Sequence, residues 1–192
     1  MMRIWRLWSR EANKRVYAKK YGEITQGDTM LRKLKEKDAL LMLEWMHDEE
    51  ICSGFQYPFA DMTLVKAEDF IRHSYDEENQ HFAFVNEQDE YLGTVSLKHI
   101  SHVNDKAEYA VVARKCAQGT GAAQRATEEL LRYAFTELNL NKVCLSVLAE
   151  NVRAQKFYEK CGFKREGLEK DAVKIKGIYH DHIWYGIVRR GA

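Results

Sequence analysis

Gln118-Gly119-Thr120-Gly121-Ala122-Ala123 is the stretch that decides the fold of this chain. It lies between a strand-like run, residues 107–113, and an amphipathic helical segment. Small residues let a ligand approach the backbone closely, and the free N–H groups at a helix start favour an anion. No Lys-Ser/Thr pair follows the second glycine, and Gln124 replaces the third glycine of a dinucleotide fingerprint. The stretch therefore predicts a diphosphate cradle of another kind, with a flexible turn as the alternative.

The segments after this loop strengthen the prediction. Apolar residues recur at three- and four-residue steps and form one helical face: Ala123, Ala126, Leu130, Leu131, Ala134, Phe135 and Leu138. Residues 142–148 then alternate like a half-buried strand. Asn151 is a natural N-cap and Gly162 a natural stop for the next helix. The order is strand, cradle, helix, strand, helix.

Two motifs in this region resemble one family. Gln118 to Ala123 reads Gln-x-x-Gly-x-Ala, and Asn151 to Phe163 reads Asn-x-x-Ala-x-x-x-Tyr-Glu-Lys-x-Gly-Phe. Together they are similar to the GNAT superfamily of acetyl-CoA-dependent N-acetyltransferases, and most similar to its RimJ/RimL-like branch. The similarity runs from about Met30 to about Arg190. It implies an α/β fold with a mixed sheet, two splayed central strands, and a gap that admits the pantetheine arm of acetyl-CoA.

The remaining pattern predicts a single layered domain. Further strands are expected at 31–34, 81–85, 91–100, 163–166 and 179–188, and further helices after Asp38 and Thr63. We expect an N-acetyltransferase domain over residues 30–192, preceded by an extension over residues 1–29. In that extension basic residues surround an apolar stripe that starts at Trp5 and Trp8, which favours a helix docked on its own or a neighbouring subunit. A helix on a membrane surface or a partner and a disordered basic tail are the alternatives.

Composition narrows the class of protein. The 192 residues carry a formal net charge of +1, which gives no general reason to expect a nucleic-acid partner. The 4 cysteines are scattered without a Cys-x-x-Cys pair, as is typical of reduced thiols in the cytoplasm. No apolar run is long enough to span a bilayer. We therefore expect a cytoplasmic monomer or homodimer.

The resemblance implies how acetyl-CoA is held. Amides from Gly119 to Ala123 would bind the diphosphate, the strand backbone would pair with pantetheine, and strand backbone near Val112 would donate to the thioester oxygen. Asn151 would cap its helix and bind pantetheine, and Arg114, Lys115 and Arg125 could add positive charge. The expected cofactor-binding residues are Val111, Val112, Ala113, Gln118, Gly119, Thr120, Gly121, Ala122, Ala123 and Asn151.

Two residues are the expected catalytic groups. Tyr158 matches the tyrosine that the family uses as general acid for the departing thiolate, and its alternative is a tyrosine that only packs. Glu108 is the expected base, since an attacking alkylamine is mostly protonated at neutral pH. A solvated strand-end carboxylate is the alternative for Glu108, and Glu150 and Glu49 are weaker candidate bases.

The acceptor is predicted only as a class. The wall of its site would include Phe55, Tyr57 and Phe59, with the carboxylates of residues 48–50 (Asp48, Glu49 and Glu50) nearby. Aromatic faces and carboxylates suit a cationic amine. A protein N-terminus in the manner of RimJ/RimL-like enzymes is the first expectation, and a polyamine or an amino sugar is the second. A catalytically silent CoA-binding module is the alternative of another class.

One further pattern suggests a metal. His180 and His182 alternate onto one strand face, as zinc ligands can. No third ligand is identifiable, so we expect no metal cofactor and read the pair as a polar strand end.

Overall fold

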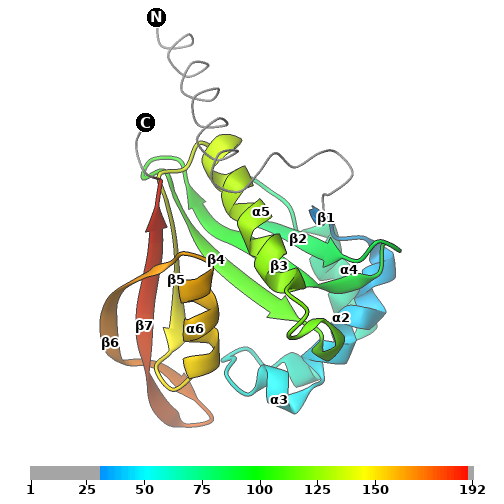
Figure 1. The fold of residues 1–192 in the computed structure, drawn as a ribbon. Helices are drawn as coiled ribbons and strands as arrows, with labels where there is room; N and C mark the ends of the chain where they lie inside the picture. Colours follow the sequence, from blue (N-terminus) through cyan, green and yellow to red (C-terminus); the bar gives the residue numbers. More distant parts are fainter. Residues whose placement is uncertain (1–30, 190–192) are drawn as a thin grey trace, which may run out of the picture.

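The computed structural model describes residues 31–189, and Figure 1 shows the fold. A sheet of 7 strands has the order β1-β2-β3-β4-β5-β7-β6. The strands are β1 (Leu31–Lys33), β2 (Gln80–Val85), β3 (Tyr91–Ser101), β4 (Lys106–Ala113), β5 (Lys142–Leu148), β6 (Lys164–Ile175) and β7 (Ile178–Val188). The helices are α2 (Ala39–Met46), α3 (Glu49–Cys52), α4 (Leu64–Arg72), α5 (Ala122–Thr136) and α6 (Val152–Lys160). The prediction of a mixed α/β fold is confirmed.

The centre of the sheet is where the strands separate. β4 and β5 are parallel and pair only at residues 106–108 with residues 142–144. The other neighbouring strands pair antiparallel. Beyond Glu108 the two central strands diverge, and Figure 1 shows the opening between β4 and β5 beside α6. This is the splayed geometry that the sequence motifs imply.

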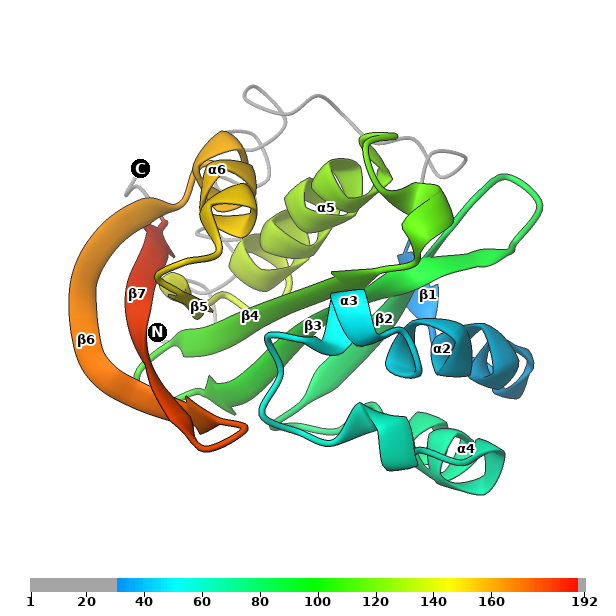
Figure 2. The same ribbon diagram turned by 90° about the horizontal axis from the view of Figure 1, so that it is seen from below.

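Helices cover both faces of the sheet. Figure 2 shows α5 and α6 on one face and α2, α3 and α4 on the other. Strand alternation divides β4 between these faces, because Tyr109 packs in the core with α5 while Ala110 and Val112 turn to the opposite side. The apolar stripe of α5 is completely buried at Leu130, Ala134 and Phe135, as its spacing predicts.

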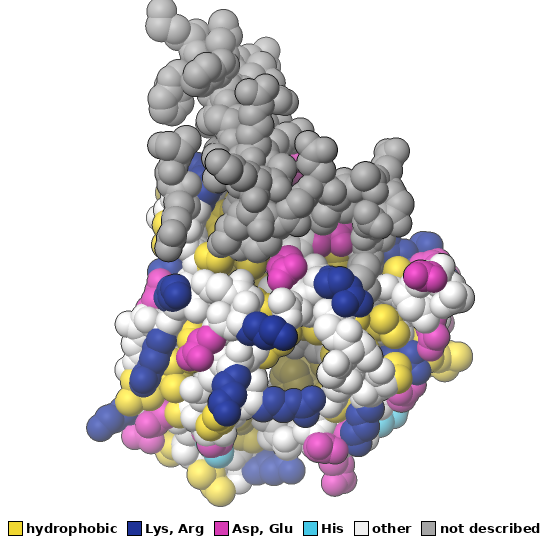
Figure 3. All heavy atoms as spheres, in the orientation of Figure 1, with side chains coloured by type: hydrophobic (Ala, Val, Ile, Leu, Met, Phe, Trp, Pro, Cys, Tyr) yellow, Lys and Arg dark blue, Asp and Glu magenta, His cyan; other side chains and the backbone are white. Residues whose placement is uncertain are grey.

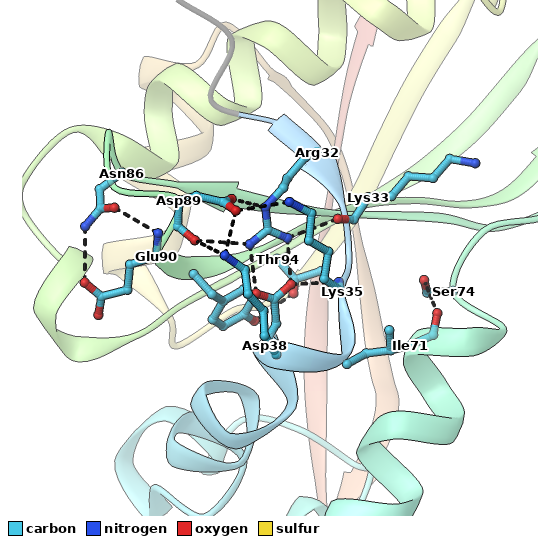
Figure 4. Close-up of polar contacts among 12 residues, drawn as sticks. Arg32, Lys33, Lys35, Asp38, Ile71, Ser74, Asn86, Asp89, Glu90 and Thr94 are labelled. Carbon is cyan, nitrogen blue, oxygen red and sulfur yellow. Dashed lines mark hydrogen bonds and ion pairs between the residues drawn. The ribbon is translucent and has the colours of Figure 1, made fainter.

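A polar network fastens the first strand to the rest of the sheet (Figure 4). Arg32 donates to Asp38 at 2.7 and 2.8 Å and also binds Asp89 of the β2–β3 turn. Lys35 and Lys37 reach the same Asp89 carboxylate, which holds its pKa far below the usual range. The sequence predicts a helix after Asp38, and α2 begins there, but the Asp38 side chain does not cap it. Its buried carboxylate instead accepts from Arg32 and from the Lys35 amide, so it joins β1 to the turn before α2.

Two elements differ from the sequence prediction. β6 extends over 12 residues, whereas the pattern predicted a strand only to Glu166. Most of its side chains are exposed, so no alternation of apolar residues marks its length. The short helix α3 was not predicted, and the Asp48 side chain caps it by accepting from Glu50 and Ile51 amides.

Some predictions fall outside the described residues. The extension, residues 1–29, lies there with the last three residues of the chain, so the predicted domain boundary stays a prediction. Within residues 31–189, no helix is long and apolar enough to cross a membrane.

Candidate active site

The predicted cradle is a tight turn at the start of α5. Gly119 and Gly121 have φ angles of +76° and +80°, a backbone region that other residues rarely adopt. Thr120 closes the turn, since its hydroxyl donates to the Ala117 carbonyl at 2.8 Å and accepts from the Ala122 amide at 3.2 Å.

This turn leaves backbone donors without acceptors. Within residues 31–189, the N–H groups of Gly119, Gly121, Ala123 and Gln124 find no hydrogen-bond acceptor. These amides surround a helix N-terminus, where the partial positive charge favours an anion. The loop has the donors that a diphosphate needs, and its residues fit CoA.

Positive charge reaches the cradle from two arginines. A Cβ atom on Gly121 would lie 3.1 Å from Nη1 of Arg125, so that guanidinium lies over the turn. Arg153 of α6, which the sequence reading missed, donates to Oε1 of Gln118 at 2.8 Å. Figure 3 shows a hollow between α6 and the start of α5, with Lys and Arg side chains around its rim.

Two other cations, which the sequence suggested as further positive charge for the diphosphate, form ion pairs with carboxylates instead. Arg114 is buried and binds Glu44 at 2.6 Å and Glu90 at 2.8 Å. Lys115 binds Asp48 at 2.7 Å. Their ion pairs join the strand end and the following turn to α2, the β2–β3 turn and α3. These ion pairs fix the end of β4 and the turn before α5 relative to the face that carries α2 and α3.

The backbone of β4 offers hydrogen-bonding groups to the gap. The Arg114 amide donates to the Leu92 carbonyl of β3 at 2.9 Å. Because antiparallel pairing alternates, Val112 also turns its backbone groups to β3, whereas Val111 and Ala113 turn theirs to the gap. Gly93 supports this assignment, since a Cβ there would lie 2.3 Å from the Val112 carbonyl oxygen. Val111 and Ala113 are therefore the two residues whose backbone can pair with an extended ligand.

Tyr158 lies between the two halves of the split sheet. Its ring centroid is 6.1 Å from that of Tyr109 on β4 and 6.4 Å from that of Tyr185 on β7. No hydrogen bond of its hydroxyl is found within residues 31–189. Burial raises the pKa of Tyr158 to about 12, so the hydroxyl keeps its proton at neutral pH.

Glu108 lies on the other face of the sheet from Tyr158. It follows the alternation of Ala110 and Val112, and its carboxylate accepts from Nζ of Lys98 at 2.8 Å. The structure therefore separates the two predicted catalytic groups, with β4 and its splayed edge between them. Of the weaker candidate bases, Glu150 binds His180 and Glu49 is an exposed residue of α3.

A large apolar pocket occupies the face with α2 and α4. Its volume is about 790 Å³, within the ~300–1,000 Å³ that is usual for small-molecule sites. The predicted aromatic wall is present, because Phe55, Tyr57 and Phe59 all line it. Trp45 adds a fourth ring, with its centroid 5.0 Å from that of Phe59. The pocket reaches β4 at Ala110, Val111 and Val112, so its far end meets the edge of the gap.

The predicted carboxylates are not part of this pocket. Asp48 and Glu50 bind Lys115, with Nζ–O distances of 2.7 and 3.2 Å. Asp69 of α4 is the carboxylate that does line it. Residues 48–50 follow α2 closely in the sequence, but Asp48 and Glu50 lie beside Lys115, just before the glycine turn.

His81 is a pocket residue that the sequence reading placed only as a strand start. It lies on β2 opposite Ser96 of β3, and its Nδ1 is 2.8 Å from the Ser96 hydroxyl oxygen. Burial, with the nearby charge of Lys98, lowers the pKa of His81 to about 4. The ring is therefore neutral at pH 7. Strand alternation could have indicated that His81 faces the interior, because it puts His81 on the same face as Ala83, which is completely buried.

Asn151 and the residues around His180 use their side chains in hydrogen bonds within the fold. Asn151 caps α6, since its side chain accepts from the Ala154 amide at 3.0 Å, and its contact with pantetheine stays a prediction. His180 bonds to Glu150, and Asp181 accepts from the Asp171 amide. No group of three His, Cys, Asp or Glu side chains suited to a metal ion occurs in the described residues.

Known proteins share this arrangement. A family model described as "Acetyltransferase (GNAT) domain" matches residues 28–164. A spermidine N(1)-acetyltransferase of Vibrio cholerae is 31% identical over 152 residues, which is 79% of this chain and 87% of that one. A putative ribosomal N-acetyltransferase of Bacillus subtilis is 34% identical over 98 residues, 51% of this chain and 54% of that one.

A solved structure agrees with these sequence relatives. Spermidine N-acetyltransferase from Vibrio cholerae, in complex with CoA and spermine, superposes with a TM-score of 0.74 and 30% identity, covering 82% of this chain and 94% of that one. The RimJ/RimL-like branch stays a prediction, because the relatives include spermidine acetyltransferases. The family model, the relatives and the shared fold show that this chain is an N-acetyltransferase that belongs to the GNAT family.

Proposed function

We propose that this enzyme transfers the acetyl group of acetyl-CoA to a primary amine bound in the pocket beneath α2 and α4. One observation carries the proposal: β4 forms a wall of the pocket through Ala110 and Val112 while Val111 and Ala113 face the gap. A thioester in the gap and an amine in the pocket would meet at one strand edge. This arrangement is what a direct attack requires.

Different residues bind the cofactor, stabilise the oxyanion and protonate the leaving thiolate. Cradle amides and the two arginines, Arg125 and Arg153, hold the diphosphate. When the amine attacks the thioester carbonyl, negative charge develops on its oxygen, and a gap-facing amide of Val111 or Ala113 stabilises that charge. The C–S bond then breaks, and the Tyr158 hydroxyl supplies a hydrogen bond or proton to the departing sulfur.

The proton of the attacking amine is removed by a group on the pocket side of the sheet. Glu108 is the proposed base, acting directly or through a water, and its ion pair with Lys98 holds it in place. Glu108→Gln should shift activity to higher pH, where the amine deprotonates unaided. An unchanged pH profile would assign this role to another group.

The identity of the acceptor is open among three amines. The sequence motifs favour a protein N-terminus, which agrees with a relative described as a putative ribosomal N-acetyltransferase. The spermidine acetyltransferases among the relatives favour a polyamine. An amino sugar is the third candidate. The pocket volume admits a small amine or the first residue of a peptide.

Thiol release from acetyl-CoA, followed with a panel of amines and mass spectrometry of the products, tests the proposal. The panel contains short peptides with free N-termini, spermidine, simple alkylamines and amino sugars. We expect CoA release that depends on the amine and a product heavier by one acetyl group. Acetyl-CoA binding without turnover on any amine would contradict it.

A further inference from the structure

The pocket is apolar where a substrate body would lie. Phe55 and Phe59 meet edge to face with centroids 5.3 Å apart, and Phe59 packs on Trp45 in the same way. Three methionines, Met42, Met46 and Met62, fill the space around these rings. Flexible thioethers and aromatic faces bind apolar bodies of varied shape.

A group of uncharged polar side chains lies at the end of the pocket that is formed by the sheet. Thr94 and Ser96 come from β3, and His81 comes from β2, all on the sheet beside β4. His81 and Ser96 bond to each other at 2.8 Å. An amine that enters the pocket therefore finds uncharged polar partners next to the strand where the thioester would lie.

The charges that line the pocket are mostly positive. Lys66, Arg72 and Lys98 are cations, whereas Asp69 is the one carboxylate among the lining residues of the described chain. Asp69 is engaged by Arg72 at 3.4 Å on the same helix. Lys66 reaches only a neutral acceptor in the described chain, the Asp61 carbonyl at 3.2 Å. A second ammonium group in the pocket would meet like charge and apolar surface.

The nearby carboxylates that could have received a second ammonium already have cationic partners. Asp48 and Glu50 form their ion pairs with Lys115, and Glu108 forms its pair with Lys98. An ammonium moved from water to an apolar site is strongly disfavoured unless it is paired. The pocket thus opposes the feature that distinguishes a polyamine from a simple amine.

We infer that the acceptor is a monoamine: one primary amine directed at β4, carried on an apolar alkyl or aromatic body without a second cationic group. This inference rests on the proposed function and selects among its acceptors. It would separate this enzyme from its spermidine-acetylating relatives by the class of acceptor amine.

A matched pair of acceptors tests the inference. Hexylamine and 1,6-diaminohexane have the same chain length and differ by one ammonium group. With saturating acetyl-CoA, we expect kcat/KM for hexylamine to exceed that for the diamine by ~10-fold or more, equivalent to about 1.4 kcal/mol. The kcat/KM for phenethylamine should be similar to that for hexylamine, and the kcat/KM for spermidine should be as low as that for the diamine. Equal or faster turnover of the diamine and spermidine would overturn the inference while leaving the proposed function intact, whereas turnover of no amine at all would overturn both.

A charge reversal provides the second test. Lys66→Glu places a carboxylate on the pocket wall and should raise the diamine-to-monoamine ratio of kcat/KM by ~10-fold. Lys170→Glu makes the same charge change on the exposed strand β6, away from the pocket, and should leave the ratio unchanged. Equal ratios in the two variants would show that wall charge does not select the acceptor, which contradicts the inference.

Discussion

The two faces of the sheet use similar apolar residues in different ways. On the α5 face, Leu130 and Phe135 are completely buried, and the hydroxyl of buried Tyr109 bonds to Thr127 at 2.6 Å. On the α2 and α4 face, aromatic rings surround an open volume of about 790 Å³. Empty apolar volume is destabilising, so a sequence that keeps it gives up stability for a ligand. Both faces carry buried core residues, but the α2 and α4 face also keeps the volume in which we propose that the acceptor binds.

The largest effect of a single substitution is expected at the cradle, which lies at the start of α5 and is proposed to bind the diphosphate. Gly121→Glu should lower acetyl-CoA affinity by ~10³-fold, because the carboxylate repels the diphosphate and displaces charge-assisted hydrogen bonds. Isothermal titration calorimetry measures this loss. Gly177→Glu is the matched control, since Gly177 has a similar φ of +86° and no neighbour within 4 Å of its Cβ position. Equal losses in both variants would show that backbone strain rather than diphosphate contact is responsible.

A second test separates chemistry from packing at Tyr158. Tyr158→Phe should reduce kcat by ~10²-fold with little change in acetyl-CoA affinity, because only the proton donor is removed. Tyr185→Phe removes a hydroxyl from the same ring cluster, one that bonds to Glu159 at 3.0 Å. It should affect the unfolding temperature more than kcat. Wild-type kcat in Tyr158→Phe would leave the tyrosine with a packing role only.

A pair of truncations sharpens the comparison between faces. Leu130→Ala should lower the free energy of unfolding by about 3 kcal/mol, with kcat/KM per folded molecule unchanged. Tyr57→Ala should cost only about 1 kcal/mol, as expected for one aromatic pair, yet raise the acceptor KM by ~10-fold. Urea unfolding and steady-state kinetics measure the two quantities. A large stability loss in Tyr57→Ala would mean that the pocket wall also belongs to the core.

The smallest effect concerns the pH dependence of stability. The pKa of His81 is about 4 in the folded protein and ordinarily 6.5, so the unfolded chain binds more protons between these values. Stability contributed by the neutral ring is complete above pH 6.5 and is lost as pH falls through 4. After solvent screening we expect a loss of about 2 kcal/mol for the wild type that is absent in His81→Gln. Urea unfolding at pH 7, 5.5 and 4 gives the comparison, and parallel curves for the two proteins would be inconsistent with it.

Sequence reasoning succeeded where a local pattern carries the information. The glycine turn at 118–123, the helical stripe up to Phe135 and the cap at Asn151 all depend on neighbours close in the chain, although Leu138, the last residue of the predicted stripe, lies beyond the end of α5 at Thr136. The aromatic wall was also predicted, because Phe55, Tyr57 and Phe59 occur within one short loop. Each of these features requires particular residues at particular spacings.

Sequence reasoning failed where a residue forms its ion pair or hydrogen bond with a residue far away in the chain. Arg114 and Lys115 precede the cradle by only a few residues, yet their ion pairs with Glu44, Glu90, Asp48 and Glu50 draw them toward α2, the β2–β3 turn and α3. The pairing of His81 with Ser96 depends on strand register, which the sequence does not display. Whether a carboxylate faces a pocket or a lysine is decided by such contacts.

The short pairing between β4 and β5 has a consequence for the enzyme without its co-substrate. Three residue pairs join these strands before they diverge, so the protein carries two open strand edges in the middle of its sheet. Open edges are templates for adding another strand, and in a free protein this invites self-association. A bound extended ligand blocks those edges and stabilises the folded state by mass action. Acetyl-CoA would then protect the enzyme from aggregation in addition to serving as its acetyl donor.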